Sequence, residues 1–179
     1  MNKKRVIAYK NIFYKDGISN KRIYVQGEPG CGKSMFAIKL VHDWVNVNQP
    51  SSNENPAFDD LLTIQQFKFL FFIRLREVKG QEYLIQMIKT QLIDKMFTED
   101  DREGGYKHFL RIINSKKFLV VQDGLDEWEG RNEVEPSMAG FQYDKCTVLT
   151  TTRPWKLADE RFNNIKIDTL IEVEGLGDT

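Results

Sequence analysis

The chain has 179 residues, 41% of them hydrophobic and 29% charged, and its 26 lysines and arginines balance its 26 aspartates and glutamates. This composition predicts a globular protein of about one domain and excludes a disordered chain, while the lack of any 18-residue apolar run excludes a membrane-spanning helix. The zero net charge provides no basic field that would attract nucleic acid.

The cysteines and the N-terminal residues indicate the cellular compartment in which the protein is located. Cys31 and Cys146 are the two cysteines, and they suggest neither a disulfide framework nor a zinc site. The charged first residues are followed by no long apolar stretch, so the sequence predicts no secretion signal. We therefore expect a reducing, cytoplasmic location.

Five apolar segments have the length and composition of strands, and helical or long connections separate them. The expected strands are 23–26, 67–75, 118–122, 146–151 and 165–170, and the expected helices are 35–45, 80–96, a helix after Gly104-Gly105 and a short helix at 156–161. Strands connected in this way pair in parallel through right-handed crossovers. The sequence therefore predicts a three-layer α/β fold, with a five-stranded, mainly parallel sheet and helices on both faces.

The first expected strand runs into a glycine-rich turn that opens the first helix. Residues 27–34 fit the pattern G-x-x-x-x-G-K-[ST] of a phosphate-binding loop, in which backbone N–H groups and a helix N-terminus face the phosphates. Lys33 would reach the β- and γ-phosphates, and the Ser34 hydroxyl would coordinate Mg²⁺. Pro29 would stiffen the loop without donating an N–H group. The expected nucleotide-binding residues are Gly27, Glu28, Pro29, Gly30, Cys31, Gly32, Lys33, Ser34 and Met35.

The second motif is Asp123-Gly124-Leu125-Asp126-Glu127, which follows the third expected strand directly. Ligands of open α/β sheets bind at the carboxyl ends of strands, so Asp123 is placed to hold Mg²⁺ together with Ser34. Glu127, or alternatively Asp126, would orient and partly deprotonate an attacking water. The motif therefore predicts the metal and catalytic side of a nucleotide site.

The third motif, Thr150-Thr151-Thr152-Arg153-Pro154, stands at the end of the next strand. A guanidinium group matches the geometry of a phosphate, so Arg153 would contact the γ-phosphate and report its presence. By itself this arginine would be an ordinary surface residue. The two other motifs make the sensing role the better interpretation.

These three motifs, in this order, resemble those of the NACHT family of signal-transducing NTPases, the nucleotide-binding core of NOD-like receptors. The acidic motif is the most specific, because a small residue after the first aspartate and a further acidic pair are typical of that family. Supporting similarities are Asp43-Trp44, Phe72-Ile73-Arg74-Leu75-Arg76 and Glu172-Val173-Glu174-Gly175-Leu176. The turn at 153–155 and the segment 167–170 look most like the large invertebrate sets of such receptors.

The resemblance implies a P-loop NTPase fold in which residues 1–20 lead into a nucleotide-binding domain at 21–177. The strand that ends at Arg153 would lie between those that end at Gly27 and Asp123, so that the three motifs meet at one triphosphate. The implied cofactors are ATP or dATP, ADP and Mg²⁺, with slow ATP hydrolysis serving a molecular switch. The ADP form would be closed and monomeric, and the ATP form would be open and homo-oligomeric, in cytosolic sensing of the innate immune or cell-death type.

The chain also departs from the family pattern. Gln122 is polar where the family usually continues an apolar strand. No helical lid, winged-helix domain, effector domain or repeat sensor follows Thr179, and the nucleotide-sensing histidine of the winged-helix part has no counterpart. We therefore expect a fragment that meets effector proteins through the missing domains. By itself it would bind nucleotide weakly and hydrolyse it poorly.

Two alternative functions stay open. One is another P-loop ATPase or kinase that acts on a small molecule or a nucleic acid, although neither an acceptor pocket with an arginine-bearing lid nor a basic strand-binding face is visible in the sequence. The other is a nucleotide-independent interaction module. The presence of Lys33, Ser34 and Asp123 argues against the second alternative.

Overall fold

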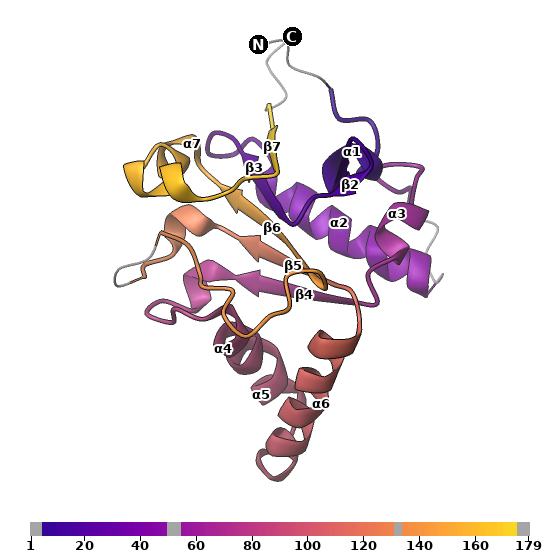
Figure 1. Ribbon diagram of the computed structural model, residues 1–179, viewed down its shortest axis with the longest axis vertical. Coiled ribbons are helices and arrows are strands. Elements are labelled where there is room, and N and C mark those ends of the chain that lie inside the picture. The colour runs from indigo at the N-terminus through magenta and orange to yellow at the C-terminus, as the bar shows by residue number, and fades with distance from the viewer. Residues whose placement is uncertain (1–4, 50–54, 131–133, 175–179) are drawn as a thin grey trace.

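The chain forms a five-stranded sheet with helices on both faces (Figure 1). The computed structural model describes residues 5–49, 55–130 and 134–174. The strands are β1 (Tyr14–Lys15), β2 (Ile18–Ser19), β3 (Arg22–Gln26), β4 (Phe69–Arg74), β5 (Phe118–Asp123), β6 (Cys146–Thr152) and β7 (Thr169–Glu172). The helices are α1 (Tyr9–Phe13), α2 (Lys33–Asn48), α3 (Leu62–Gln65), α4 (Leu84–Ile88), α5 (Asp94–Met96), α6 (Arg102–Ser115) and α7 (Pro154–Leu157).

Strands β3 to β7 form one sheet in the order β4-β5-β6-β3-β7, and every neighbouring pair in it is parallel. Strands β1 and β2 form a separate antiparallel hairpin. The predicted three-layer α/β fold is confirmed, and so is the predicted place of β6 between β3 and β5. Because the carboxyl ends of parallel strands meet at one edge of a sheet, the segments that follow β3, β5 and β6 are neighbours.

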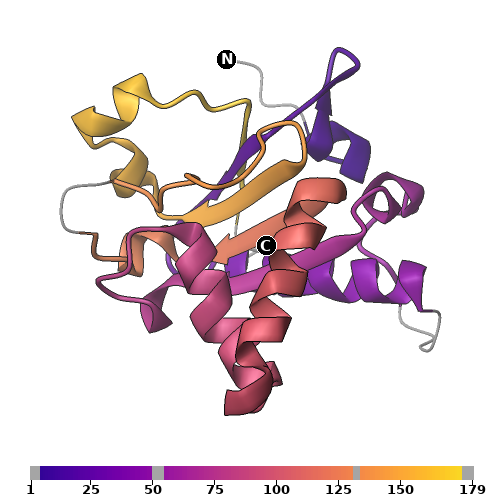
Figure 2. The ribbon, with the colours of Figure 1, turned by 60° about the horizontal axis from the view of Figure 1, so that its bottom comes forward.

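Alternate residues of β5 pack into two hydrophobic cores, one on each face of the sheet. Phe118 and Val120 belong to the core that α4 and α6 cover, whereas Leu119 and Val121 belong to the core that α1, α2 and α3 cover. Figure 2 shows α4 to α6 lying across the front of the strands. Burial on both faces explains why the central strands are continuous apolar runs and do not alternate with polar residues. Within the described ranges, none of the helices combines the length and the apolar character that crossing a membrane requires.

Two helix boundaries differ from the predicted ones. Helix α6 begins at Arg102 and runs through Gly104 and Gly105, which we expected to precede it. A Cβ added to Gly105 would lie 2.6 Å from the Phe97 ring, so this glycine permits close packing and does not break the helix. Helix α4 begins at Leu84 and is followed by a π-helical turn and α5. The expected helix at 80–96 therefore starts later and is interrupted.

The C-terminal elements also shift. Strand β7 covers Thr169–Glu172, later than the expected 165–170, because its position is set by pairing with residues 23–26 of β3. The short helix expected at 156–161 is divided between α7 and a 3-10 helix at Glu160–Asn164. Local apolar content alone therefore misplaced this edge strand, because pairing with its neighbour decides where the strand begins and ends.

The segment before β3 contains ordered structure that the sequence pattern did not predict. Helix α1 buries Tyr9, Ile12 and Phe13 in the core beside α2. The Asp60 carboxylate accepts hydrogen bonds from the backbone N–H groups of Tyr9 and Lys10, each at 2.8 Å. The proposed division between residues 1–20 and 21–177 stays a prediction. Residues 1–4, the C-terminal end of that domain at 175–177 and the motif residues Gly175 and Leu176 lie outside the described residues.

Asp43 of α2 connects this helix to α1. Its side chain is fully buried, and its Oδ2 accepts hydrogen bonds from the Tyr9 hydroxyl at 2.5 Å and from the Ala57 N–H group at 2.7 Å. Lys39 Nζ forms an ion pair with Oδ1 at 3.2 Å. Burial, and next the hydrogen bond to Asp43, raises the pKa of Tyr9 well above its usual range, so the phenol stays a donor. Loss of any one of these partners would leave the buried charge less well compensated and would destabilise the fold.

We predict that Tyr9→Phe lowers the free energy of unfolding by about 1.5–3 kcal/mol, because it removes a hydrogen bond to a buried charge. Urea-induced unfolding measures the loss. Tyr14→Phe is the matched control, since the Tyr14 hydroxyl donates to the neutral Gln66 Oε1 at 2.9 Å in a half-buried position. We expect the control to lose less than about 1 kcal/mol. Equal losses in the two variants would contradict the role given to Asp43.

Candidate functional site

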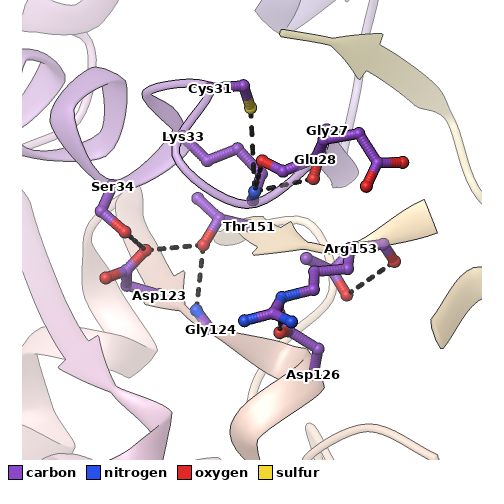
Figure 3. Close-up of polar contacts among 11 residues, drawn as sticks. Gly27, Glu28, Cys31, Lys33, Ser34, Asp123, Gly124, Asp126, Thr151 and Arg153 are labelled. Carbon is purple, nitrogen blue, oxygen red and sulfur yellow. Dashed lines mark hydrogen bonds and ion pairs between the residues drawn. The ribbon is translucent and has the colours of Figure 1, made fainter. Parts of the chain in front are cut away.

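The loops that follow β3, β5 and β6 lie side by side at the carboxyl edge of the sheet. Strand pairing sets Gln26 opposite Thr152 and Gln122 opposite Thr150, so the three strands end close together. The glycine-rich loop, the acidic turn and the Thr-Thr-Arg turn therefore reach one another, as Figure 3 shows. The convergence of the three motifs that we predicted from the sequence is present in the structure.

The glycine-rich loop has the backbone shape of an anion site. Gly30 and Gly32 have φ angles of +76° and +101°, in the left-handed region that favours glycine. Helix α2, 16 residues long, begins at Lys33 immediately after the loop. Its unpaired N–H groups and positive dipole end face this loop, so the two features together suit phosphate oxygens.

A glycine is required at position 27 because neighbouring atoms leave no room for a side chain, and not because of its backbone angles. A Cβ at this position would lie 2.5 Å from Cys31 Sγ and 2.6 Å from the carbonyl oxygen of Val173. The Val173 N–H group also donates to the Gln26 carbonyl oxygen at 2.8 Å. The segment after β7 therefore packs directly on the beginning of the loop.

Lys33 folds back over the loop that precedes it. Its Nζ donates to the carbonyl oxygens of Gly27 at 2.7 Å and Glu28 at 2.9 Å, and it lies 3.8 Å from Cys31 Sγ. These contacts hold an ammonium group beside the backbone N–H groups of the loop. A positive charge in this place suits a phosphate chain.

Ser34 and Asp123, the two predicted metal ligands, are in direct contact. Ser34 Oγ donates to Asp123 Oδ1 at 2.9 Å, although 89 residues separate them in the chain. Hydroxyl and carboxylate oxygens are ligands that Mg²⁺ prefers, and Mg²⁺ usually keeps several water or phosphate ligands. In the part of the chain that the structure describes, no three His, Cys, Asp or Glu side chains gather as a metal site. The residues present therefore fit Mg²⁺ held jointly by protein and phosphate.

Asp126 and Arg153 form an ion pair next to this contact. Arg153 Nε lies 2.8 Å from Asp126 Oδ2, and the Asp126 side chain is only 6% exposed, compared with 41% for Arg153. The charge of Asp126 also acts on Lys156, three residues beyond Arg153. Burial, and next the charge of Arg161, lowers the pKa of Lys156, whereas the carboxylates of Asp159 and Asp126 act in the opposite direction. Asp126 is thus engaged with cations and is poorly placed to contact a water molecule.

Glu127, in contrast, is exposed. Its carboxyl group lies against Gly124, where an added Cβ would be 3.6 Å from Glu127 Cδ and 3.7 Å from Oε2. Gly124 directly follows Asp123, so the Glu127 carboxyl group lies against the turn that begins after the predicted metal ligand. Of the two acidic residues that the sequence left open as the base, Glu127 is the more exposed, and the base role stays a prediction.

The remaining predicted contacts are spread along the rim of the loop. Glu28 and Pro29 are exposed and Cys31 is half-buried. The Met35 side chain is 69% exposed, while its backbone belongs to the first turn of α2. Cys146 lies away from the loop in the core, and burial raises the pKa of its thiol to about 12. The loop residues can therefore contribute mainly through their backbone.

Thr151 is a site residue to which the sequence gave no role of its own. It is 1% exposed, and its Oγ1 donates to Asp123 Oδ1 at 2.6 Å and accepts from the Gly124 N–H group at 2.9 Å (Figure 3). A signal for it was available, because Thr151 stands two residues before Arg153 and strand residues two apart share a face. The identity of its partner could not be read from spacing alone.

A hollow of about 610 Å³ lies beside the beginning of the loop, between the N-terminal segment and β7. Its polar lining includes Gln26, which directly precedes the loop, and Glu174. Its apolar lining is formed by Val6, Ile12, Phe36, Phe58, Leu170, Ile171 and Val173. This volume is within the range of small-molecule sites, and an apolar wall with a few polar groups is typical of them.

Comparison with known proteins agrees with this geometry. Residues 21–179 match the family described as the NACHT domain. The chain is also similar to the human NACHT, LRR and PYD domains-containing protein 2, at 26% identity over a stretch that covers 88% of this chain and 15% of that protein. The chain thus spans about 15% of the length of this curated relative. The likeness to invertebrate receptor sets stays a prediction. With the loop, the acidic turn and the arginine turn at one edge of the sheet, the chain belongs to the NACHT family of nucleotide-binding NTPase domains.

Proposed function

We propose that this chain is the ATP- and Mg²⁺-binding, slowly hydrolysing switch domain of a cytosolic NOD-like receptor in innate immune signalling. The contact between Ser34 Oγ and Asp123 Oδ1 at 2.9 Å is the observation that carries the proposal. It joins the end of the phosphate loop to the end of β5, as a shared metal ligand set requires. Family membership supports a nucleotide and Mg²⁺ in general, and the choice of ATP over dATP is part of the proposal.

The loop residues would bind and orient the phosphates. Backbone N–H groups of the glycine-rich loop and the first turn of α2 donate to phosphate oxygens, and Lys33 adds a positive charge. Ser34 and Asp123 would hold the metal ion through their oxygens. Bound Mg²⁺ would supply the positive charge that stabilises the phosphoryl group in transfer. Glu127 orients a water molecule and accepts its proton.

Arg153 would report the γ-phosphate. The ion pair with Asp126 uses the Nε of the guanidinium. The Arg153 side chain is 41% exposed, so its guanidinium stays accessible to a phosphate oxygen. Asp126 therefore orients the guanidinium by one edge while the other edge serves recognition.

The hollow beside the loop would hold the base and the sugar. It begins at Gln26, directly before the first loop glycine, and its Phe36 wall is in the first turns of α2. A base in this position would contact the N-terminal segment, α2 and the segment after β7 together. Binding would thereby link distant parts of the chain, as a switch domain requires.

The receptor context extends beyond this chain. We propose a closed, monomeric ADP form and an open, homo-oligomeric ATP form, with effector proteins recruited through other domains of the receptor. The curated relative is named for NACHT, LRR and PYD domains, which supports a multidomain setting. A weak ATPase is sufficient for such a role, because a switch depends on which nucleotide is bound and not on rapid turnover.

We predict that Lys33→Ala raises the Kd for Mg-ATP about 10- to 100-fold, since a charge-assisted hydrogen bond contributes about 1.5–3 kcal/mol. Isothermal titration calorimetry measures the change. Lys107→Ala removes an exposed lysine of α6 that pairs with Glu103, and it should leave the Kd unchanged. Failure of the wild type to bind saturating Mg-ATP would overturn the proposal and favour a nucleotide-independent module. Phosphate transfer to an added acceptor, or ATPase stimulation by DNA or RNA, would favour the kinase or motor alternative.

We further predict that Glu127→Gln retains ATP affinity within about twofold while slowing hydrolysis about 100-fold, within the range that general bases contribute. Single-turnover release of phosphate, together with the Kd, separates the two effects. Glu129→Gln is the matched control, because Glu129 is exposed and pairs with Lys79. Unchanged hydrolysis in Glu127→Gln would remove the base role from this residue.

A further inference from the structure

Thr151 occupies the junction between the metal carboxylate and the strand that carries Arg153. Its hydroxyl uses its donor on Asp123 Oδ1 and one acceptor position on the Gly124 N–H group. The side chain is 1% exposed, so water cannot substitute for these contacts. One buried hydroxyl therefore holds both the candidate metal ligand and the turn that follows it.

The contacts of Asp123 make its two oxygens unequal. Oδ1 accepts hydrogen bonds from Ser34 Oγ at 2.9 Å and from Thr151 Oγ1 at 2.6 Å. Among the described residues, no donor contacts Oδ2. Two donors, one from helix α2 and one from strand β6, approach this oxygen and fix the plane of the carboxylate. The second oxygen is thereby left for a metal ion or a metal-bound water.

We propose that Thr151 is a positioning residue that orients Asp123 for Mg²⁺. The inference rests on the proposed function, since it concerns the same nucleotide site. Groups that hydrogen-bond to a metal ligand raise metal affinity by fixing the ligand's orientation, and their removal commonly costs 10- to 100-fold in affinity. Thr151 acts through Asp123 and needs no contact of its own with the nucleotide.

A comparison with Thr150 separates the positioning role of Thr151 from a purely structural one. It lies on the same strand and is 2% exposed, and its hydroxyl donates to Gln122 Oε1 at 2.9 Å. Both hydroxyls therefore bridge β6 to β5, in similarly buried places. Of these two threonine hydroxyls, only that of Thr151 contacts Asp123, because neighbouring strand residues point to opposite faces.

The test measures how strongly Mg²⁺ assists nucleotide binding, as the ratio of the Kd for ATP in EDTA to the Kd in saturating Mg²⁺. We expect Thr151→Val to reduce this ratio about tenfold while the Kd in EDTA changes less than about twofold. Thr151→Ser keeps the hydroxyl and should restore the ratio. Thr151→Ala, a second variant without the hydroxyl, covers the case in which valine prevents folding. Urea-induced unfolding verifies that each variant is folded.

The control is Thr150→Val, which should lose stability to a similar degree and keep the wild-type ratio. An unchanged ratio in both hydroxyl-free variants of Thr151, or an equal loss in Thr150→Val, would overturn the inference. A wild type that binds ATP with no dependence on Mg²⁺, or that binds no ATP, would instead overturn the proposed function. The two failures are therefore distinguishable.

Discussion

The position of β6 between β5 and β3 is the constraint on which the site depends. Because β6 pairs with both neighbours in parallel, its carboxyl end lies between the acidic turn and the phosphate loop. Thr151 can then contact Asp123, and Arg153 can pair with Asp126, while both stay next to the glycine-rich loop. If β6 lay outside β3 and β5, its carboxyl end would be about one strand spacing, ~4.8 Å, farther from one of these two loops.

This arrangement places polar side chains in the centre of the sheet, and each needs a partner there. Strand β6 is buried along its whole length even though threonines form its last part. Thr150 bonds to Gln122 across the strand boundary, and Thr151 bonds to Asp123. The polar Gln122, a departure from the family's apolar strand, is therefore compensated by Thr150. Hydrogen-bonded pairs of this kind avoid the cost of an unpaired polar group and also fix the register of β5 against β6.

Helix α2 connects the site to the N-terminal segment. Its first residue, Lys33, belongs to the phosphate loop, and Asp43 further along fastens α1 through Tyr9. The next residue, Trp44, donates its Nε1–H to the carbonyl oxygen of Phe67, just before β4. The Asp43-Trp44 pair, which the sequence offered only as a supporting similarity, therefore anchors two separate segments to one helix. Helix α2 thus carries both the lysine of the phosphate loop and the contacts that hold α1 and the segment before β4.

The sequence by itself determined what depends on local chemistry. The glycine spacing predicted the loop, since Gly30 and Gly32 adopt angles that other residues resist, and the two-sided apolar runs predicted the central strands. The resemblance of the three motifs to those of the NACHT family implied that Ser34, Asp123 and Arg153 would converge. Only the tertiary structure decided the partners: Asp126 with Arg153, Thr151 with Asp123, Tyr9 with Asp43, and the limits of β7. These contacts join segments far apart in the chain, and their geometry follows from strand register and side-chain packing, which no local pattern contains.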